Sequence, residues 1–349
     1  MKFLNFILFV MFCVSTVFCQ VRKLDCEDFN IRGMYVGASD SIFNKIGLAK
    51  QLKINAFVID VRDDFGDITC DLGDSKIKSE KYIKDIKSLL NVLKKNGIYT
   101  IARIATFKNK MKKGRTADVP FLIKNKDGSI YFDKEKVSWI NPYKKEVQKY
   151  ILKIAKLAAK AGFDEIQFDY IRFPPFKSLE NTEVAEFLKK KSKIELINEF
   201  LDFVVPSLHE LKIKVSADVF GCVIPETMGI LSAESSKNLG QDYMSIASKV
   251  DYICPMIYPS HWPIDSFDIK YPDLEPYKIV KKSMEYSNNA LKHQSNKTRP
   301  WIQAFSATWL KNGIWKEYTI KQVQDQINAL RESGIKEFCL WNPSARYNY

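Results

Sequence analysis

Residues 142–173 read PYKKEVQKYILKIAKLAAKAGFDEIQFDYIRF and contain one helical segment followed by one short apolar run. Apolar side chains recur at helical spacing between Pro142, a residue typical of a helix start, and Gly162, a residue typical of a helix end. The apolar run that follows, residues 165–173, has the length of a buried strand. This stretch therefore predicts a helix that ends at about Ala161 and then a strand.

The same alternation of strand and helix recurs eight times along the chain. The predicted strands are residues 31–37, 55–62, 98–106, 165–173, 215–220, 252–258, 300–305 and 337–342. The later predicted helices are residues 81–95, 142–161, 182–211, 241–250, 277–291 and 320–332. Eight such steps, with the first and last strands near the two ends of the chain, predict an α/β protein with a closed (β/α)8 TIM barrel.

The third predicted strand is followed by a long excursion, residues 107–141, before the next helix begins. Within it a Lys126-Asp127-Gly128 turn between two short apolar runs predicts a hairpin. We expect a single barrel domain over residues 20–349, with the excursion covering one end of it.

The first residues of the chain are typical of an export signal. Lys2 precedes residues 3–19, FLNFILFVMFCVSTVFC, which carry no further charge. The run is shorter than the about 20 residues of a membrane-spanning helix. We predict that residues 1–19 are a signal peptide and that the protein is exported to the periplasm or cell surface. Lipidation of Cys19 is the alternative, and it would attach the protein to a membrane.

The composition is that of a globular protein with a basic excess. Hydrophobic residues make up 46% and charged residues 27%, which excludes disordered and fibrous classes. Lys and Arg total 54 against 41 Asp and Glu, but only residues 108–115 form a concentrated basic run, which is typical of a solvated loop. Because no glycine-rich phosphate-binding motif follows any predicted strand, we expect no nucleotide and no nucleic acid as partner.

The cysteines and histidines do not predict a metal site. The five cysteines beyond residue 19 are Cys26, Cys70, Cys222, Cys254 and Cys339, an odd number without short spacings. This pattern argues against a disulfide framework and against zinc, and three histidines are few for a metal centre. We expect neither a metal ion nor another cofactor.

Charged residues gather at the carboxyl ends of the predicted strands, where active sites of such barrels lie. Asp60 and Arg62 end the second strand, Arg103 lies on the third, Asp169 on the fourth and Asp218 on the fifth. Because side chains alternate along a strand, Asp60 and Arg62 are predicted to share a face. If these faces point inward, three carboxylates and at least one guanidinium group converge.

Two interpretations of this convergence stay open. The first is a structural layer of ion pairs, for example Asp60 with Arg103 or Asp169 with Arg172. The second is glycosidic cleavage, which takes one carboxylic acid to protonate the leaving oxygen and one carboxylate to attack or stabilise the anomeric carbon. Neighbouring strands lie about 4.8 Å apart, so Asp169 and Asp218 can approach the separation of a retaining pair, about 5 to 5.5 Å.

Aromatic and amide side chains occupy the ends of the last three predicted strands. They are Tyr258, Trp301, Gln303, Trp341 and Asn342. Sugars are bound by rings that stack on aromatic faces and by amides that hold the hydroxyl groups. Core packing is the alternative role of each single aromatic residue.

Five segments, in their order and spacing, resemble the bacterial glycoside hydrolase barrels that are distantly related to α-amylases. They are GFDEIQFDYIRFP (162–174), SADVFG (216–221), VDYICPMIYPSHW (250–262), RPWIQAF (299–305) and LWNPSARY (340–347). The resemblance covers about residues 31–347 and implies a (β/α)8 hydrolase of a polysaccharide, with Asp169 at the nucleophile position. Asp218 lies near the position of a glutamate acid/base in those enzymes, and Gln167 stands where they carry an arginine.

We therefore predict an exported glycosidase with Asp169 as nucleophile or charge stabiliser and Asp218 as general acid/base, acting on a cell-envelope glycan. The residues predicted to bind the substrate are Asp60, Arg62, Arg103, Arg172, Tyr258, Gln303, Trp341 and Asn342. One alternative is a carbohydrate-binding barrel that has lost its proton donor. Another is a protein that binds an anionic polymer or a host surface through its basic excess, with a strong dependence on salt.

Overall fold

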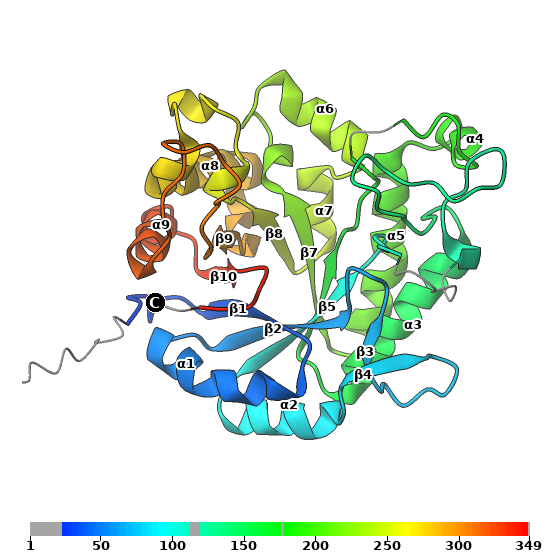
Figure 1. Ribbon diagram of the computed structural model, residues 1–349, viewed down its shortest axis with the longest axis horizontal. Helices are drawn as coiled ribbons and strands as arrows, with labels where there is room; N and C mark the ends of the chain where they lie inside the picture. The colour runs from blue at the N-terminus through cyan, green and yellow to red at the C-terminus, as the bar shows by residue number, and fades with distance from the viewer. Residues whose placement is uncertain (1–22, 112–118, 176–177, 348–349) are drawn as a thin grey trace, which may run out of the picture.

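Eight parallel strands close into a barrel in the computed structural model, which describes residues 23–111, 119–175 and 178–347 (Figure 1). The ring closes because the first strand pairs with both the second and the last. The barrel strands are β1 (Ile31–Gly37), β2 (Ala56–Arg62), β5 (Tyr99–Ala105), β6 (Glu165–Asp169), β7 (Lys214–Phe220), β8 (Tyr252–Met256), β9 (Trp301–Gln303) and β10 (Glu337–Trp341). The predicted (β/α)8 barrel is confirmed.

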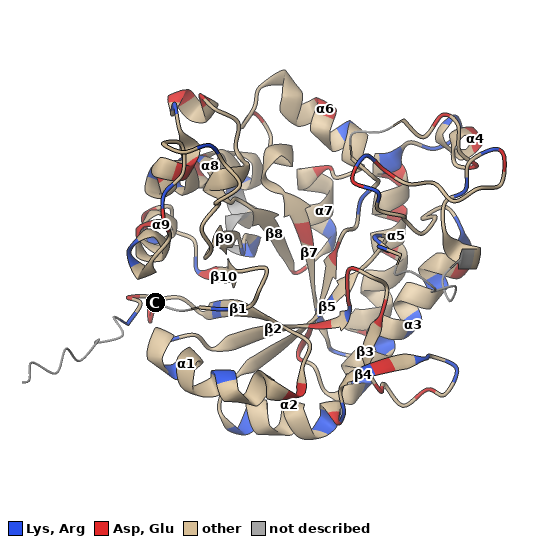
Figure 2. Ribbon diagram, viewed as in Figure 1, with Lys and Arg blue, Asp and Glu red and all other residues tan. Residues whose placement is uncertain are grey.

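The helices surround this barrel on its outside (Figure 1). They are α1 (Lys45–Leu52), α2 (Ile86–Lys95), α3 (Lys145–Ala161), α4 (Ala185–Leu188), α5 (Lys193–His209), α6 (Ile230–Leu239), α7 (Tyr243–Lys249), α8 (Pro276–Leu291) and α9 (Ile320–Glu332). Short 3₁₀ helices lie at Asp40–Asn44, Val119–Phe121, Gly221–Val223, Pro259–His261, Ser266–Asp268, Pro272–Leu274 and Lys292–Lys297. Figure 2 shows basic and acidic residues interspersed along the outer helices.

The prediction of one long helix over residues 182–211 is wrong. The segment forms the short α4 and then the separate helix α5. The physical reason is Ser192, whose hydroxyl accepts a hydrogen bond from the backbone N–H of Glu195 while the Glu195 carboxylate accepts one from the N–H of Ser192. This reciprocal cap starts a new helix. The sequence analysis also missed α6.

Two further strands extend the barrel after β2. They are β3 (Ile68–Cys70) and β4 (Ser79–Ile83), and β3 pairs antiparallel with β2. The helix predicted from residue 81 therefore begins only at Ile86, where Asp85 caps it. The hairpin predicted in the excursion is confirmed, because Lys124 pairs antiparallel with Ile130 around the turn.

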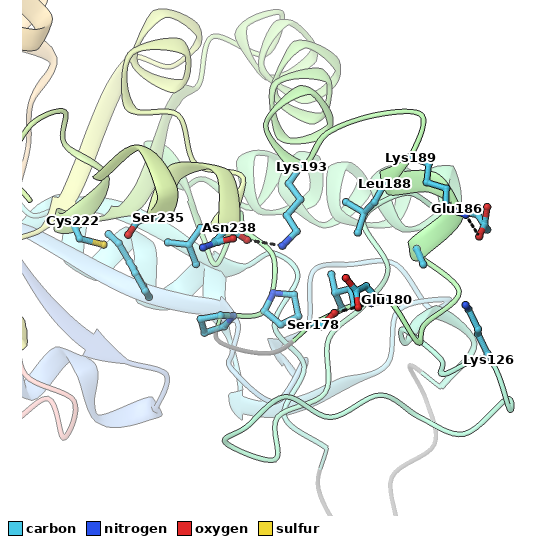
Figure 3. A pocket seen from close by; sticks show the side chains of 16 residues that line it. Lys126, Ser178, Glu180, Glu186, Leu188, Lys189, Lys193, Cys222, Ser235 and Asn238 are labelled. Atoms are coloured by element: carbon cyan, nitrogen blue, oxygen red, sulfur yellow. Dashed lines mark hydrogen bonds and ion pairs between the residues drawn. The ribbon is translucent and has the colours of Figure 1, made fainter. Parts of the chain in front are cut away.

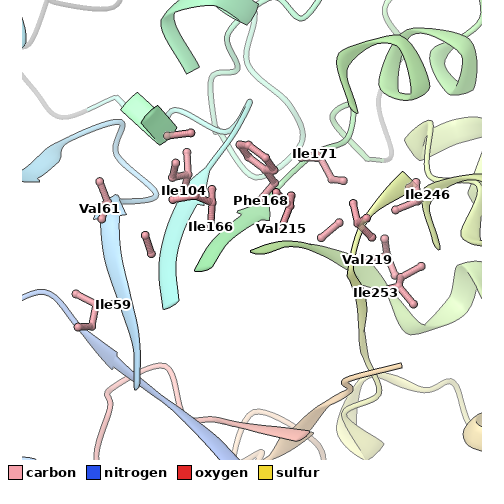
Figure 4. Packing of buried hydrophobic residues seen from close by; sticks show 14 of the residues in the cluster. Ile59, Val61, Ile104, Ile166, Phe168, Ile171, Val215, Val219, Ile246 and Ile253 are labelled. Carbon is pink, nitrogen blue, oxygen red and sulfur yellow. The ribbon is translucent and has the colours of Figure 1, made fainter. Parts of the chain in front are cut away.

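The strands bury apolar side chains against the helices. Figure 4 shows this outer layer, to which Ile59 on β2, Ile104 on β5, and Ile166 and Phe168 on β6 belong. Side chains alternate along a strand, so the residues between these positions face the barrel interior. The polar residues at the strand ends thereby come together inside the ring.

The interior has a polar layer near the amino-terminal ends of the strands. There Arg299 forms ion pairs with Glu165 at 2.7 Å and with Glu337 at 2.7 Å. The guanidinium carbon lies 3.8 Å from the centre of the Tyr252 ring. All three charged groups are buried, so this layer is a structural cluster on the face opposite to the expected active site.

The predicted signal peptide, residues 1–19, lies outside the described residues. Within the described part of the chain, none of the helices has the length and hydropathy needed to cross a membrane.

Candidate active site

Arg103 is the centre of a charged cluster at the carboxyl end of the barrel. Its Nη1 donates to Asp60 Oδ1 at 2.6 Å, and its Nε donates to Asp169 Oδ2 at 2.9 Å. Its Nη2 lies 2.6 Å from the same oxygen of Asp169 and 2.9 Å from Asp64 Oδ1. The second oxygen of Asp60 accepts a hydrogen bond from the Tyr35 hydroxyl at 2.6 Å. One buried guanidinium group on β5 thus joins three carboxylates, which come from β2, from β6 and from the loop after β2.

The pKa values of these carboxylates respond to burial and to the nearby cations. Burial raises the pKa of Asp60, and Arg103 and Tyr35 offset only part of this effect. Burial acts in the same direction on Asp64, but Arg103 and Lys108 outweigh it and hold its pKa well below the usual range. Asp64 is therefore ionised at any physiological pH.

Lys108 and Tyr170 complete the cluster on one side. The Lys108 Nζ donates to Asp64 Oδ2 at 2.7 Å and to the Tyr170 hydroxyl at 2.8 Å. Tyr170 directly follows Asp169 and has a φ of 51°, which is unfavourable for an aromatic residue. Its backbone N–H donates to the Asp169 carboxylate at 2.6 Å. Strained residues of this kind are common at functional sites, where the surrounding contacts hold them.

Asp218 lies beside Asp169 on the neighbouring strand. Phe168 of β6 pairs in register with Ala217 of β7, so the next residues, Asp169 and Asp218, are adjacent and face the interior together. Burial and the negative charge of Asp169 raise the pKa of Asp218 far above its usual value. The Trp301 indole donates to Asp218 Oδ1 at 2.8 Å, which lowers the pKa of Asp218 but does not offset the effect of burial. Asp218 therefore holds its proton to a higher pH than an exposed aspartate does.

Aromatic rings line the interior beside these carboxylates. Trp341 packs against Tyr35 with ring centres 4.4 Å apart and against Trp301 with ring centres 5.6 Å apart. The guanidinium carbon of Arg103 lies 5.7 Å from the centre of the Trp341 ring. Tyr258 is buried in the same apolar cluster as Trp301, and burial together with the charges of the two carboxylates raises its pKa. The site therefore combines charged groups with flat apolar surfaces.

Arg172 lies next to the cluster, and its partners are aromatic rings. Its guanidinium carbon is 4.8 Å from the centre of the Trp139 ring and 4.5 Å from that of Phe220. Its Nη1 donates to the backbone oxygen of Phe173 at 3.2 Å. The ion-pair partner of Asp169 is thus Arg103 and not Arg172.

Arg62 is not brought to the cluster, although it was predicted to share a face with Asp60. A bulge in β2 shifts the register, so that Arg62 lies opposite Ile104, which faces the helices. Arg62 donates to the backbone oxygens of Ala105 and Lys108 and to Asn109 Oδ1. These bonds place Arg62 on the outside of the barrel, where it holds the segment that follows β5.

Gln303 and Asn342, also predicted to bind substrate, use their side chains within the protein. The Gln303 amide accepts from the Ser260 backbone at 3.0 Å and donates to Asp273 at 2.9 Å. The Asn342 amide donates to the backbone oxygen of Ala304 at 2.8 Å. Both residues thus position the loops that surround the site.

Five residues touch the cluster without having been predicted to do so from the sequence: Tyr35, Asp64, Lys108, Tyr170, and Trp301 as a partner of Asp218. Lys108 opens the basic run that was predicted to be a solvated loop, yet its ammonium group lies against the carboxylates. A signal was present for Asp64, because it follows the carboxyl end of a strand in an acidic stretch. Nothing in the local sequence distinguishes the others from core aromatic residues or surface lysines.

The residues that the structure describes contain no group of three or more His, Cys, Asp or Glu side chains arranged to hold a metal ion. The five cysteines in this part of the chain are free, and four of them are buried.

Three solved structures are among those similar to this chain. A hypothetical protein from Ruminiclostridium thermocellum is 30% identical over 53% of this chain and 97% of its own length, with a TM-score of 0.43. The PgaB (BpsB) glycoside hydrolase domain from Bordetella bronchiseptica is 15% identical over 91% of this chain and 94% of its own, with a TM-score of 0.60. The Bacillus cereus spore cortex-lytic enzyme SleL is 12% identical over 91% of this chain and 71% of its own, with a TM-score of 0.53.

The TM-scores show that the PgaB domain and SleL share the fold of this chain. Their sequence identities are too low to show more than the fold. No curated protein sequence matches the chain. Residues 30–347, which include every barrel strand, match the family described as "Putative glycosyl hydrolase domain". The chain therefore belongs to this glycosyl hydrolase family.

Proposed function

We propose that the protein is an exported glycosidase that cleaves a cell-envelope polysaccharide with Asp169 as nucleophile and Asp218 as general acid/base. The observation that carries this proposal is the opposite environment of two adjacent carboxyl groups. Asp169 is ion-paired with Arg103, whereas burial and the charge of Asp169 keep the pKa of Asp218 high. Glycosidic cleavage requires one carboxyl group that can donate a proton and one carboxylate that can attack the anomeric carbon.

In the first step, the Asp218 proton passes to the glycosidic oxygen while the bond from this oxygen to the anomeric carbon breaks. The Asp169 carboxylate attacks the anomeric carbon and forms a glycosyl ester. In the second step, Asp218, now a carboxylate, takes a proton from a water molecule that displaces Asp169. Neighbouring strands lie about 4.8 Å apart, and this short separation favours the retaining course, which leaves no room for a water molecule between the two carboxyl groups.

Arg103 orients the nucleophile in this proposal. It holds one oxygen of Asp169 through two of its nitrogens, and the Tyr170 N–H holds the other. Asp60 in turn fixes Arg103, and Tyr35 fixes Asp60. The Trp341 ring, which is only partly buried, offers a surface on which a sugar ring can stack.

The substrate class rests on two arguments. The first is the expected export signal, which would bring the enzyme to the envelope. The second is the fold shared with SleL, a spore cortex-lytic enzyme, which acts on an envelope structure by its name. Both support a cell-envelope glycan as substrate.

The test is a release of reducing ends from a panel of bacterial envelope glycans by the wild type, Asp169→Asn and Asp218→Asn. We expect the wild type to release reducing ends from at least one glycan and both variants to lose this activity. Asp325→Asn on the outer helix α9, where the side chain pairs with exposed Lys321, is the matched control and should keep it. Binding without turnover by the wild type would instead favour the non-catalytic carbohydrate-binding barrel.

A further inference from the structure

A cavity lies near the carboxyl ends of the two strands that carry Asp169 and Asp218. A pocket of about 830 Å³ lies beyond the ends of β6 and β7, between Pro174, Pro175 and Phe220 on one side and the helices α4 and α6 on the other. Figure 3 shows Lys193 at the start of α5 extending into it. The volume is within the range of sites that bind small molecules, about 300 to 1,000 Å³.

One residue that lines the pocket belongs to the strand that carries Asp218. Phe220 is the last residue of β7, two positions after Asp218, and it lines the pocket. Arg172, three positions after Asp169, packs over the Phe220 ring at 4.5 Å and over the Tyr170 ring at 5.1 Å. A glycan chain that leaves the active site between β6 and β7 would therefore enter this pocket.

Lys193 is a partly buried cation without a carboxylate partner among the described residues. Its Nζ donates to the backbone oxygen of Asn238 at 2.8 Å and lies 5.4 Å from the centre of the Phe173 ring. Burial lowers its pKa. A cation that is withdrawn from water and meets only neutral groups is costly, and an anionic ligand would recover this cost.

The start of α5 is held in place by close packing. A Cβ atom on Gly240 would lie 2.9 Å from the backbone oxygen of Lys193, and Gly240 has a φ of +78°. Only glycine fits this position without a shift of the helix. The ammonium group of Lys193 is therefore presented from a fixed backbone.

The other charges of the pocket nearly cancel. Lys126, Lys189, Glu180 and Glu186 also line it, and Glu186 is bound by Lys189 at 2.8 Å. Among the described residues that line the pocket, three lysines and two glutamates leave an excess of one positive charge. This excess matches a ligand group with a single negative charge.

We propose that this pocket is a subsite for a sugar residue that carries a carboxylate, and that Lys193 binds this carboxylate. The inference rests on the proposed glycosidase function and narrows its substrate to an acidic glycan. Neutral sugars would occupy the cleavage site, and the acidic residue would lie on the side of β6 and β7. Lys193 is then a determinant of specificity for a part of the substrate that does not react.

The experiment measures the binding of two matched pairs of oligosaccharides to full-length Asp169→Asn by calorimetry. The first pair has an acidic member, the tetrasaccharide of alternating N-acetylglucosamine and N-acetylmuramic acid. Its neutral member is N-acetylated chitotetraose, which lacks the lactyl carboxylates. The other pair is tetragalacturonate with its carboxyl-reduced form. We expect the acidic member of at least one pair to bind about tenfold tighter, the effect of one charge-assisted hydrogen bond.

Variants at position 193 show whether Lys193 causes the preference for the acidic oligosaccharide. In the same background, Lys193→Gln should abolish it, and Lys193→Arg should retain it. Lys190→Gln, the same chemical change at an exposed position that does not line the pocket, should also retain it. Thermal unfolding of each variant checks that the fold is intact.

Three results would each overturn the subsite. The two members of each pair could bind equally, or none of the four oligosaccharides could bind. Lys193→Gln could also reduce the affinity for the acidic and the neutral member equally. Hydrolysis is measured separately with the wild type. A preference that depends on Lys193 without hydrolysis would reject the glycosidase proposal and keep the subsite. Hydrolysis by the wild type that Asp169→Asn abolishes, without any preference for the acidic oligosaccharides, would support the glycosidase proposal and reject the subsite.

Discussion

The indole of Trp301 donates a hydrogen bond to Asp218 Oδ1 at 2.8 Å and so joins β9 to β7 across the interior of the barrel. This bond orients Asp218 but brings no positive charge to it. Because Asp218 is also buried beside Asp169, its pKa is raised far above the usual value. The protonated form that a general acid needs is thus the form that the fold favours.

Asp218→Asn should change how stability depends on pH. The native state of the wild type holds the Asp218 proton more tightly than the unfolded state, whose carboxyl pKa is about 3.9. The free energy of unfolding of the wild type therefore falls as the pH rises above about 4 toward the raised pKa of Asp218. This one group contributes a fall of up to about 1.4 kcal/mol per pH unit. The variant lacks this loss, so its melting temperature relative to wild type should increase from pH 4 to pH 8. Parallel curves over this range would contradict the raised pKa.

The roles of the two carboxyl groups predict different responses to the leaving group. A glycoside with an activated aryl leaving group needs no protonation, whereas a natural glycan does. Asp218→Asn should therefore lose about 10² to 10⁴-fold in kcat/KM on the glycan and far less on the aryl glycoside. Asp169→Asn should lose activity on both. Steady-state kinetics with the two substrates measure these losses in kcat/KM. If Asp218→Asn, like Asp169→Asn, lost the same factor on the glycan and on the aryl glycoside, the assignment would be rejected.

Arg103→Gln should destabilise the protein strongly. It leaves Asp60, Asp64 and Asp169 without the cation that joins them, and removal of one partner from a buried ion pair costs about 3 to 5 kcal/mol. Urea unfolding measures this free energy. The control is Arg331→Gln, whose partner Asp28 is on the surface and whose loss should cost at most about 1 kcal/mol. Similar midpoints for the two variants would argue against a central role of Arg103.

Trp309→Ala should weaken substrate binding without affecting the fold. Trp309 is 62% exposed in the loop after β9, and its ring stacks on Phe305 with centres 5.7 Å apart. An exposed ring at this end of the barrel can stack on a sugar, so we expect KM to rise about five- to tenfold with little change in kcat. Trp309→Phe keeps an aromatic face and should restore most of the affinity. An unchanged KM in Trp309→Ala would exclude this contact.

Export predicts the mass of the mature chain. If residues 1–19 are cleaved as a signal peptide, the secreted or envelope fraction should contain a protein that begins near Gln20. Intact mass spectrometry of this fraction measures it, and a lipid adduct on Cys19 would support the alternative of membrane attachment. Full-length protein in the cytoplasmic fraction alone would contradict export.

The sequence by itself determined the barrel and the positions of Asp169 and Asp218 near the carboxyl ends of two consecutive predicted strands. Strands and helices are encoded locally by the spacing of apolar residues, and the bounds of β1 and α9 agree with the predicted ones. The alternation of side chains along a strand shows which residues share a face, and the structure shows that Asp169 and Asp218 lie on inner faces. Such information is repeated over many residues, so single exceptions do not obscure it.

Only the tertiary structure decided which charged groups meet. The bulge in β2 turns Arg62 away from Asp60, and a bulge is a property of the pairing with β5 rather than of either strand alone. Arg103 binds Asp169 because cross-strand register brings them together, whereas Arg172, which is closer in sequence, packs on aromatic rings. The partners of a side chain are set by contacts between segments far apart in the chain, and no local pattern records them.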